Sequence, residues 1–247
     1  TARVAEARNR ARDYPLVRSE DSTGYGIART RIIVASFDTA EKAIAYFESR
    51  DYENQNDIER YGRAVAYQRA GRHYDALPIL TELLEKDKSV IAYHIGLGQT
   101  LVALDQWSDA VDLFERALGL FPRNVPLVIE YGERLLELGQ PKRAHDLLLD
   151  LLNNVPPTPA QVRLIARAAS LAGEEAEAYY YLSEYRLMIG DLAGGIGYLQ
   201  QALRLPDLQE IQRARFNARI NFIREFMSED QLRNMRSQQP VSVASTR

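Results

Sequence analysis

The amino-acid sequence predicts an all-α fold, a right-handed α-solenoid of antiparallel helix pairs closed by a C-terminal capping helix. Three columns of residues, each recurring at an interval of 34 positions, predict it. One column is alanine: Ala76, Ala110, Ala144 and Ala178. A second holds residues suited to the turn that ends a helix: Gly71, Asp105, Gly139 and Gly173. The third holds large apolar residues: Leu80, Phe114, Leu148 and Leu182.

A helix–turn–helix unit of about 34 residues is the pattern of the tetratricopeptide repeat. Its most regular copy runs from Ile91 to Pro122. Within that copy, Gly98 stands where the two helices must approach closely, and it maps to Gly132 in the next copy. Pro122 likewise maps to Pro156. Agreement of several columns in side-chain size indicates the repeat more strongly than any single motif does.

The regular part of the pattern begins at Asp57. It predicts helix pairs at 57–70 with 73–86, 90–104 with 107–120, and 124–138 with 141–153. The breaker sequence from Asn153 to Pro159 delays the next helix to about Ala160. We expect residues 174–188 to belong to two pairs, because small and large residues recur soon after them at Gly190, Ala193, Leu199 and Ala202.

Both ends of the chain depart from the regular pattern. We expect a degenerate first pair, with one helix ending near Val34 and a second from Thr39 to Arg50. Pro206 to Met227 is expected to form a long amphipathic capping helix. The predicted organisation is a joining helix and linker at 1–18, a tetratricopeptide solenoid with its cap at 19–236, and a disordered tail at 237–247. Because the first residue is Thr1, we expect the chain to be a piece of a longer protein, with the joining helix ending an upstream domain.

Composition narrows the class of protein. The net charge of −3 gives no basic excess for nucleic acid, and no apolar run approaches the roughly 18 residues of a membrane span. Without cysteine, the chain has no disulfide, no thiolate metal site and no cysteine nucleophile. These features are typical of a soluble globular protein.

Catalytic signatures are missing from the sequence. His73, His94 and His145 are too far apart to form a helical metal-ligand pair, and there is no H-E-x-x-H motif. We expect His94 to pack between helices. Gly194, Gly195 and Gly197 lie inside an expected helix rather than after a strand, so close helix packing explains them better than a phosphate loop does. We therefore expect this chain to have no enzymatic activity and no cofactor of its own.

Binding is the function that remains. A solenoid of helix pairs presents one stripe of each first helix on its inner wall, and we expect recognition residues there. Carrying that stripe through the repeats gives a predicted protein-binding groove of Tyr61, Val65, Arg69, Ile95, Gln99, Ile129, Glu133, Arg163, Arg167, Tyr180 and Glu184. Its mixture of charged, aromatic and aliphatic residues suits a peptide or protein surface. Any one of these residues could instead pack against a neighbouring helix. Tyr179, Tyr180, Tyr181 and Tyr185 either fill the junction at the shared helix or form a contact patch.

Two terminal motifs add a family resemblance. The segment Arg3 to Ala11 reads R-x-A-E-A-R-N-R-A, and Gln212 to Ile220 reads Q-x-A-R-x-x-A-R-I. With the repeats between them, these segments resemble the C-terminal tetratricopeptide domain of BepA-type periplasmic zinc metalloproteases, the β-barrel assembly-enhancing family of M48 peptidases. The resemblance covers nearly the whole chain, although only the two terminal motifs are distinctive.

The resemblance implies a function beyond generic binding. It implies a periplasmic module that binds substrate proteins or assembly-machinery partners for an upstream peptidase in outer-membrane protein quality control. Outer-membrane β-barrel proteins and their assembly machinery would be the partners, and zinc would be held only by the upstream domain. The alternative is a stand-alone adaptor or scaffold that binds peptide termini. That alternative requires basic side chains on one inner face, where Arg163 and Arg167 are the one close pair.

Overall fold

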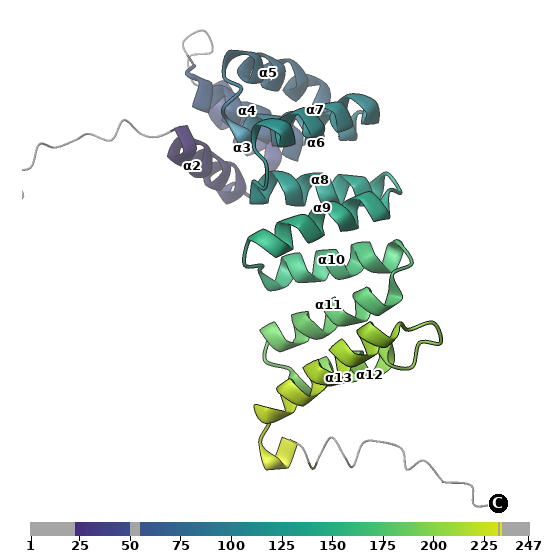
Figure 1. Cartoon of the computed structure of the whole chain (residues 1–247). Coiled ribbons are helices and arrows are strands. Elements are labelled where there is room, and N and C mark those ends of the chain that lie inside the picture. Colours follow the sequence, from purple (N-terminus) through teal and green to yellow (C-terminus); the bar gives the residue numbers. More distant parts are fainter. Residues whose placement is uncertain (1–22, 50–54, 232, 234–247) are drawn as a thin grey trace, which may run out of the picture. The chain divides into compact units, whose positions relative to one another are not determined.

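The computed structural model describes residues 23–49, 55–231 and 233, and this part of the chain is built of helices without strands (Figure 1). The predicted joining helix, linker and tail at 1–18 and 237–247 lie outside it. The chain divides into two compact units, Thr1–Ala117 and Leu118–Arg247, which are described separately.

The helices follow one another with short connections. Those that begin in the first unit are α2 (Thr23–Ser36), α3 (Ala40–Glu48), α4 (Asp57–Arg69), α5 (His73–Lys86), α6 (Ile91–Ala103) and α7 (Trp107–Leu120). Those of the second unit are α8 (Val125–Glu137), α9 (Pro141–Asn154), α10 (Pro159–Leu171), α11 (Glu175–Met188), α12 (Leu192–Ala202) and α13 (Glu210–Glu225). From α4 to α9, each predicted helix matches the observed one within one residue at either end.

One type of turn joins the two helices of each regular pair. Its central residue has a positive φ, at Gly71, Asp105, Gly139 and Gly173 (φ 73°, 59°, 70° and 83°). In each turn the next residue donates its N–H to a carbonyl five residues earlier, as Gln140 does to Leu135 at 2.8 Å. The predicted turn column is therefore confirmed, and glycine is favoured there because it adopts positive φ without strain.

The same turn recurs once outside the 34-residue interval. Gly190 (φ 85°) joins α11 to α12, and Asp191 donates to the Arg186 carbonyl at 2.8 Å. Since α11 packs on both α10 and α12, it is the second helix of one pair and the first helix of the next. The shared helix predicted at 174–188 is confirmed.

Small residues set how closely paired helices approach. A Cβ added to Gly98 of α6 would stand 2.3 Å from the ring of Phe114 in α7, and one added to Gly132 of α8 would stand 3.1 Å from Leu148 in α9. Phe114 is fully buried, so its ring cannot move aside. The glycines therefore let the large side chain of the second helix lie against the backbone of the first.

The first two helices depart from the regular pairs, because α2 and α3 pack on α4 more than on each other and the register of α3 is shifted. The alanine and large apolar columns, stepped back by 34 residues, fall on Lys42 and Tyr46, whereas the deeply buried residues of α3 are Ala43 and Phe47. A Cβ added to Gly62 of α4 would stand 2.4 Å from the Phe47 ring, so the close contact of α3 is made with the first helix of the next pair. The one-residue offset explains why the sequence pattern looks degenerate there.

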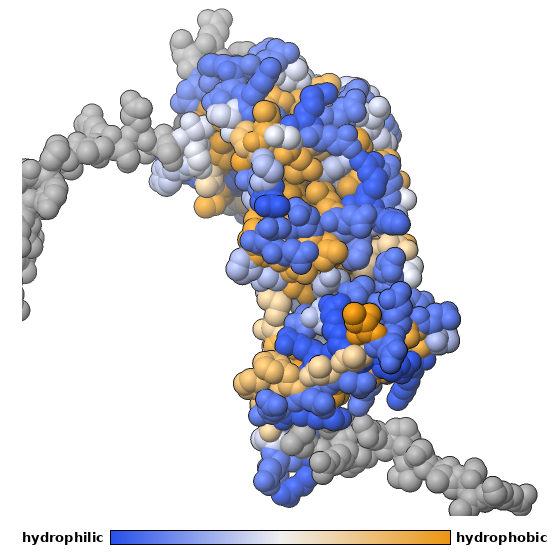
Figure 2. All heavy atoms as spheres, in the orientation of Figure 1, coloured by the Kyte–Doolittle hydropathy of each residue, from blue (hydrophilic) through white to orange (hydrophobic). Residues whose placement is uncertain are grey.

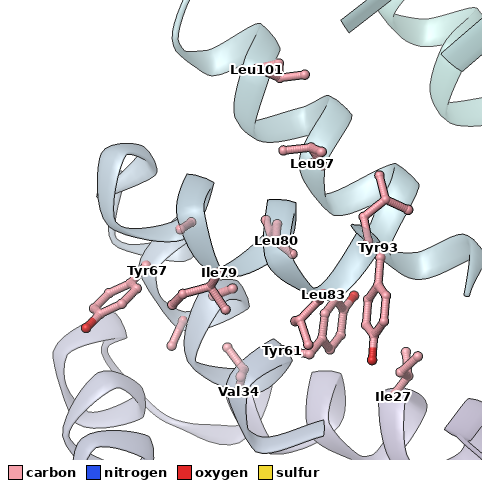
Figure 3. Close-up of a cluster of buried hydrophobic side chains, with 14 of the residues drawn as sticks. Ile27, Val34, Tyr61, Tyr67, Ile79, Leu80, Leu83, Tyr93, Leu97 and Leu101 are labelled. Carbon is pink, nitrogen blue, oxygen red and sulfur yellow. The ribbon is translucent and has the colours of Figure 1, made fainter. Parts of the chain in front are cut away.

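The core of the first unit is built from consecutive helices. Figure 3 shows Tyr61 of α4 beside Tyr93 of α6, with Leu83 of α5 close to both, and the two rings lie 5.6 Å apart. In the second unit, α13 buries Phe216, Ile220 and Ile223 in a core shared with α12, and Met227, just after α13, belongs to the same core. The predicted capping helix therefore closes the described part of that unit.

The close contact at Gly98 leads to a stability prediction. We expect Gly98→Ala to lower the free energy of unfolding by about 1–3 kcal/mol, because the added methyl group overlaps the buried Phe114 ring. Gly119→Ala in α7 is the matched control. No neighbouring atom lies within 4 Å of its new Cβ, so the gain in helix propensity should stabilise the protein by roughly 0.5–1 kcal/mol.

Urea unfolding followed by circular dichroism measures both variants. Equal effects of the two substitutions would contradict the packing role of Gly98.

Candidate binding surface

In the first unit, two of the predicted groove residues belong to the core. Tyr61 is only 3% exposed, and its ring packs on Tyr93. Ile95 is 9% exposed. Burial raises the pKa of the Tyr61 hydroxyl above its usual value, which keeps that group neutral. Their side chains do not offer a contact surface in this structure.

The other groove residues of the first unit are more accessible. Val65 and Gln99 are half-buried, and Arg69 is exposed. The Arg69 guanidinium donates a hydrogen bond to the Val34 carbonyl of α2 at 2.6 Å. Arg69 therefore links α4 to α2. The exposed part of the Arg69 side chain is available to a partner.

On α8 the predicted stripe is mixed. Ile129 is half-buried and lines a small apolar hollow with Leu148 and Ile165. Glu133 lies 3.7 Å from Arg134, which also pairs with Glu130 and Glu137 at 3.2 and 2.9 Å. The basic group on this helix is thus surrounded by carboxylates of the same helix.

The α10 stripe is basic and exposed. Arg163 and Arg167 lie one turn apart on the surface, and among the described residues neither has a carboxylate within 4 Å. The Arg163 guanidinium lies 5.9 Å from the centre of the Tyr185 ring. One turn further, Leu171 is 55% exposed. The sequence analysis selected the two arginines but missed Leu171. Arg163, Arg167 and Leu171 follow one another at intervals of four residues, and this spacing indicates a common helix face.

The α11 stripe is engaged by the capping helix. Glu184 receives two hydrogen bonds from Arg219 of α13, at 2.8 and 2.6 Å, and this pairing raises the pKa of the guanidinium. Tyr180 stacks on Phe216 with ring centres 6.0 Å apart, and the Arg215 guanidinium lies 3.7 Å from the Tyr180 ring centre. Tyr180 and Glu184 therefore hold α13 in place.

The tyrosine cluster of α11 fills the junction. Tyr179 stacks on Tyr198 of α12, and Tyr181 meets His145 of α9 at 6.2 Å. Tyr180 meets α13, and Tyr185 faces α10 through Arg163. Burial raises the pKa of Tyr181 to about 12. Of the two alternatives for the cluster, the structure supports helix packing, with each ring facing a different helix.

The histidines and glycines take structural positions. His94 is buried, with Nε2 2.9 Å from the Lys88 carbonyl, as the packing interpretation expects. Close packing explains Gly195, whose added Cβ would stand 2.9 Å from Leu187. The packing interpretation is wrong for Gly194, where the Asp191 side chain accepts a hydrogen bond from the Gly194 N–H at 2.8 Å and caps the helix. It is also wrong for Gly197, where an added Cβ would have no atom of another element within 4 Å.

Within the described residues there is no group of three or more His, Cys, Asp or Glu side chains that could hold a metal ion. The same part of the chain has no helix that is long and apolar enough to cross a bilayer. Hydrophobic and hydrophilic residues are interspersed on the face shown in Figure 2. A mixed surface of this kind is compatible with binding to proteins.

Comparisons with known proteins support the fold built from these helix pairs. Residues 101–168 match the model of the tetratricopeptide repeat family. Residues 101–168 carry tetratricopeptide repeats. Among solved structures, the type IV pilus biogenesis factor PilW is similar with a TM-score of 0.56, at 19% identity over 85% of this chain and 97% of PilW. A tetratricopeptide repeat protein of Parabacteroides merdae has a TM-score of 0.50, at 12% identity over 84% of this chain and 86% of its own. At these identities the likeness shows the fold alone.

A curated protein of Vibrio cholerae is similar in sequence. Its name is "Putative beta-barrel assembly-enhancing protease", and it is 28% identical over 224 residues, which cover 89% of this chain. The match spans 46% of the length of the Vibrio protein. The chain therefore spans about half the length of that relative.

The contact between α11 and α13 leads to a prediction about the cap. A double-mutant cycle with Glu184→Gln and Arg219→Gln should give a coupling free energy on the order of 1 kcal/mol, because the pair is two-pronged and more than two-thirds buried. The cycle with Glu229→Gln and Arg233→Gln is the control. That pair is largely exposed, so its coupling should stay below about 0.5 kcal/mol. Equal coupling in the two cycles would mean that Glu184 does not hold the cap.

Proposed function

We propose that this chain is the substrate- and partner-binding module of a periplasmic zinc metalloprotease that acts in outer-membrane protein quality control. The observation that supports the proposal is the 28% identity to the Vibrio relative across 89% of the chain. The terminal motifs at Arg3–Ala11 and Gln212–Ile220 agree with it. A tetratricopeptide domain is a protein–protein interaction module, and the proposal adds the partners and the place.

In this proposal the catalytic chemistry belongs to an upstream peptidase domain. Zinc would be held there, and the tetratricopeptide domain would bind outer-membrane β-barrel proteins or their assembly machinery. The accessible stripe residues of the predicted groove, Val65, Arg69, Gln99, Ile129, Glu133, Arg163 and Arg167, would supply contacts. Tyr61, Ile95, Tyr180 and Glu184 would support that surface from within, since they are buried or engaged by other helices.

A binding experiment tests the proposal. The chain is immobilised and exposed to an outer-membrane β-barrel protein diluted from urea, to the same protein folded in detergent, and to an unfolded cytoplasmic protein of similar size and charge. We expect saturable binding of the unfolded barrel protein and at least about tenfold weaker binding of the other two, a difference of roughly 1.4 kcal/mol.

Equal binding of all three proteins, or binding of none, would contradict the proposed partners. The coding sequence upstream of Thr1 gives an independent check. The proposal requires an H-E-x-x-H helix there, and its absence would exclude the protease.

A further inference from the structure

The exposed stripe of α10 combines two unsatisfied cations with a large apolar side chain. Arg163, Arg167 and Leu171 follow one another at intervals of four residues, so they lie on one face of the helix. All three are exposed, and neither arginine has a carboxylate partner among the described residues.

Several arginines of the second unit are paired with acids. In the second unit, Arg134 pairs with Glu130 and Glu137, Arg215 with Glu177, and Arg219 with Glu184. Because the chain as a whole carries a net charge of −3, carboxylates are abundant. Arg204, Arg213 and Arg224 also have no carboxylate partner among the described residues. Arg163 and Arg167 differ from them in lying one helical turn apart, so together they are open to two acidic groups of one partner.

Charge complementarity thus specifies an acidic partner, and the spacing specifies its conformation. Four residues of helix advance by about 6 Å. Two residues of an extended chain advance by about 6.6–6.8 Å, and alternate side chains point to the same side. An extended peptide lying along α10 would therefore place every second residue over every fourth residue of the helix.

We infer that α10 binds an extended segment of a partner protein with the pattern acid-x-acid-x-apolar, its two carboxylates on Arg163 and Arg167 and its apolar side chain on Leu171. The Arg163 guanidinium lies over the Tyr185 ring, and this contact restricts the side chain and so lowers the entropy lost on binding. This inference rests on the proposed function as a protein-binding module and names the class of segment that the module binds.

Capped synthetic peptides test the inference on the whole chain. The probe is Thr-Asp-Thr-Asp-Thr-Leu-Thr, blocked at both ends so that no terminal carboxylate contributes. Two comparison peptides replace both aspartates by lysine, or place the two aspartates next to each other. Binding is measured by isothermal titration calorimetry at low salt and again in 0.5 M NaCl.

We expect the alternating acidic peptide to bind most tightly and to lose affinity in high salt, since the contacts are exposed ion pairs. Arg163→Glu with Arg167→Glu should weaken binding at least about tenfold and make the lysine peptide the better ligand. Leu171→Ala should weaken the acidic peptide with less change in the salt dependence.

Arg204→Glu is the matched control, because Arg204 is also exposed in the second unit, outside the α10 stripe. This control should leave peptide affinity unchanged, and circular dichroism should show all variants folded. Equal affinity of the alternating and adjacent acidic peptides, or an equal loss in the Arg204 variant, would overturn the inference.

The inference and the proposed function fail in distinguishable ways. If the unfolded barrel protein binds while the acidic peptide does not, the α10 site is refuted and the module stands. If the peptide binds through the two arginines while no barrel protein does, the site is supported and the proposed partners are refuted.

Discussion

The close approach of two helices at a single small residue is the constraint on which the rest of the structure depends. At Gly98 the ring of Phe114 occupies the place of a missing side chain, and Gly132 gives Leu148 a similar position. Because this contact fixes the spacing within a pair, and a positive-φ turn fixes where the second helix begins, each pair has little freedom. The predicted stripe, which on α6 and α8 includes the residue three positions before each glycine, is thereby held at a defined orientation.

The second unit contains the same positive-φ turn twice in succession. Gly173 and Gly190 make equivalent turns, so α11 is paired on both sides, and Gly195 allows α12 to approach it closely. As a result, α11 is surrounded by α10, α12 and α13 and uses its side chains to hold them. The contacts of Tyr180 and Glu184 with α13 close this part of the unit. Of the two neighbouring stripes on α10 and α11, the α10 stripe is the one whose charged residues are exposed.

The sequence was sufficient to predict the helices, their turns and the shared helix, because these follow from local periodicity and from glycine at fixed positions. It was not sufficient to predict which stripe residues are accessible. The repeat pattern predicts which face of the helix carries Tyr61, but it does not predict that the Tyr93 ring packs against Tyr61. Similarly, Glu184 lies on the predicted stripe, yet its partner Arg219 is distant in sequence. Arg163 and Arg167 were predicted from their places on the inner stripe, and the structure leaves both exposed.

The central functional claim is that partner proteins contact the α10 stripe rather than the stripe of α11. Site-specific photo-cross-linking tests it most directly, with a photoreactive residue placed in turn at Arg167, Tyr180 and Arg204 and the unfolded barrel protein as target. We expect strong cross-linking from position 167 and little from the other two. Strong cross-linking from position 180 with none from position 167 would contradict the account.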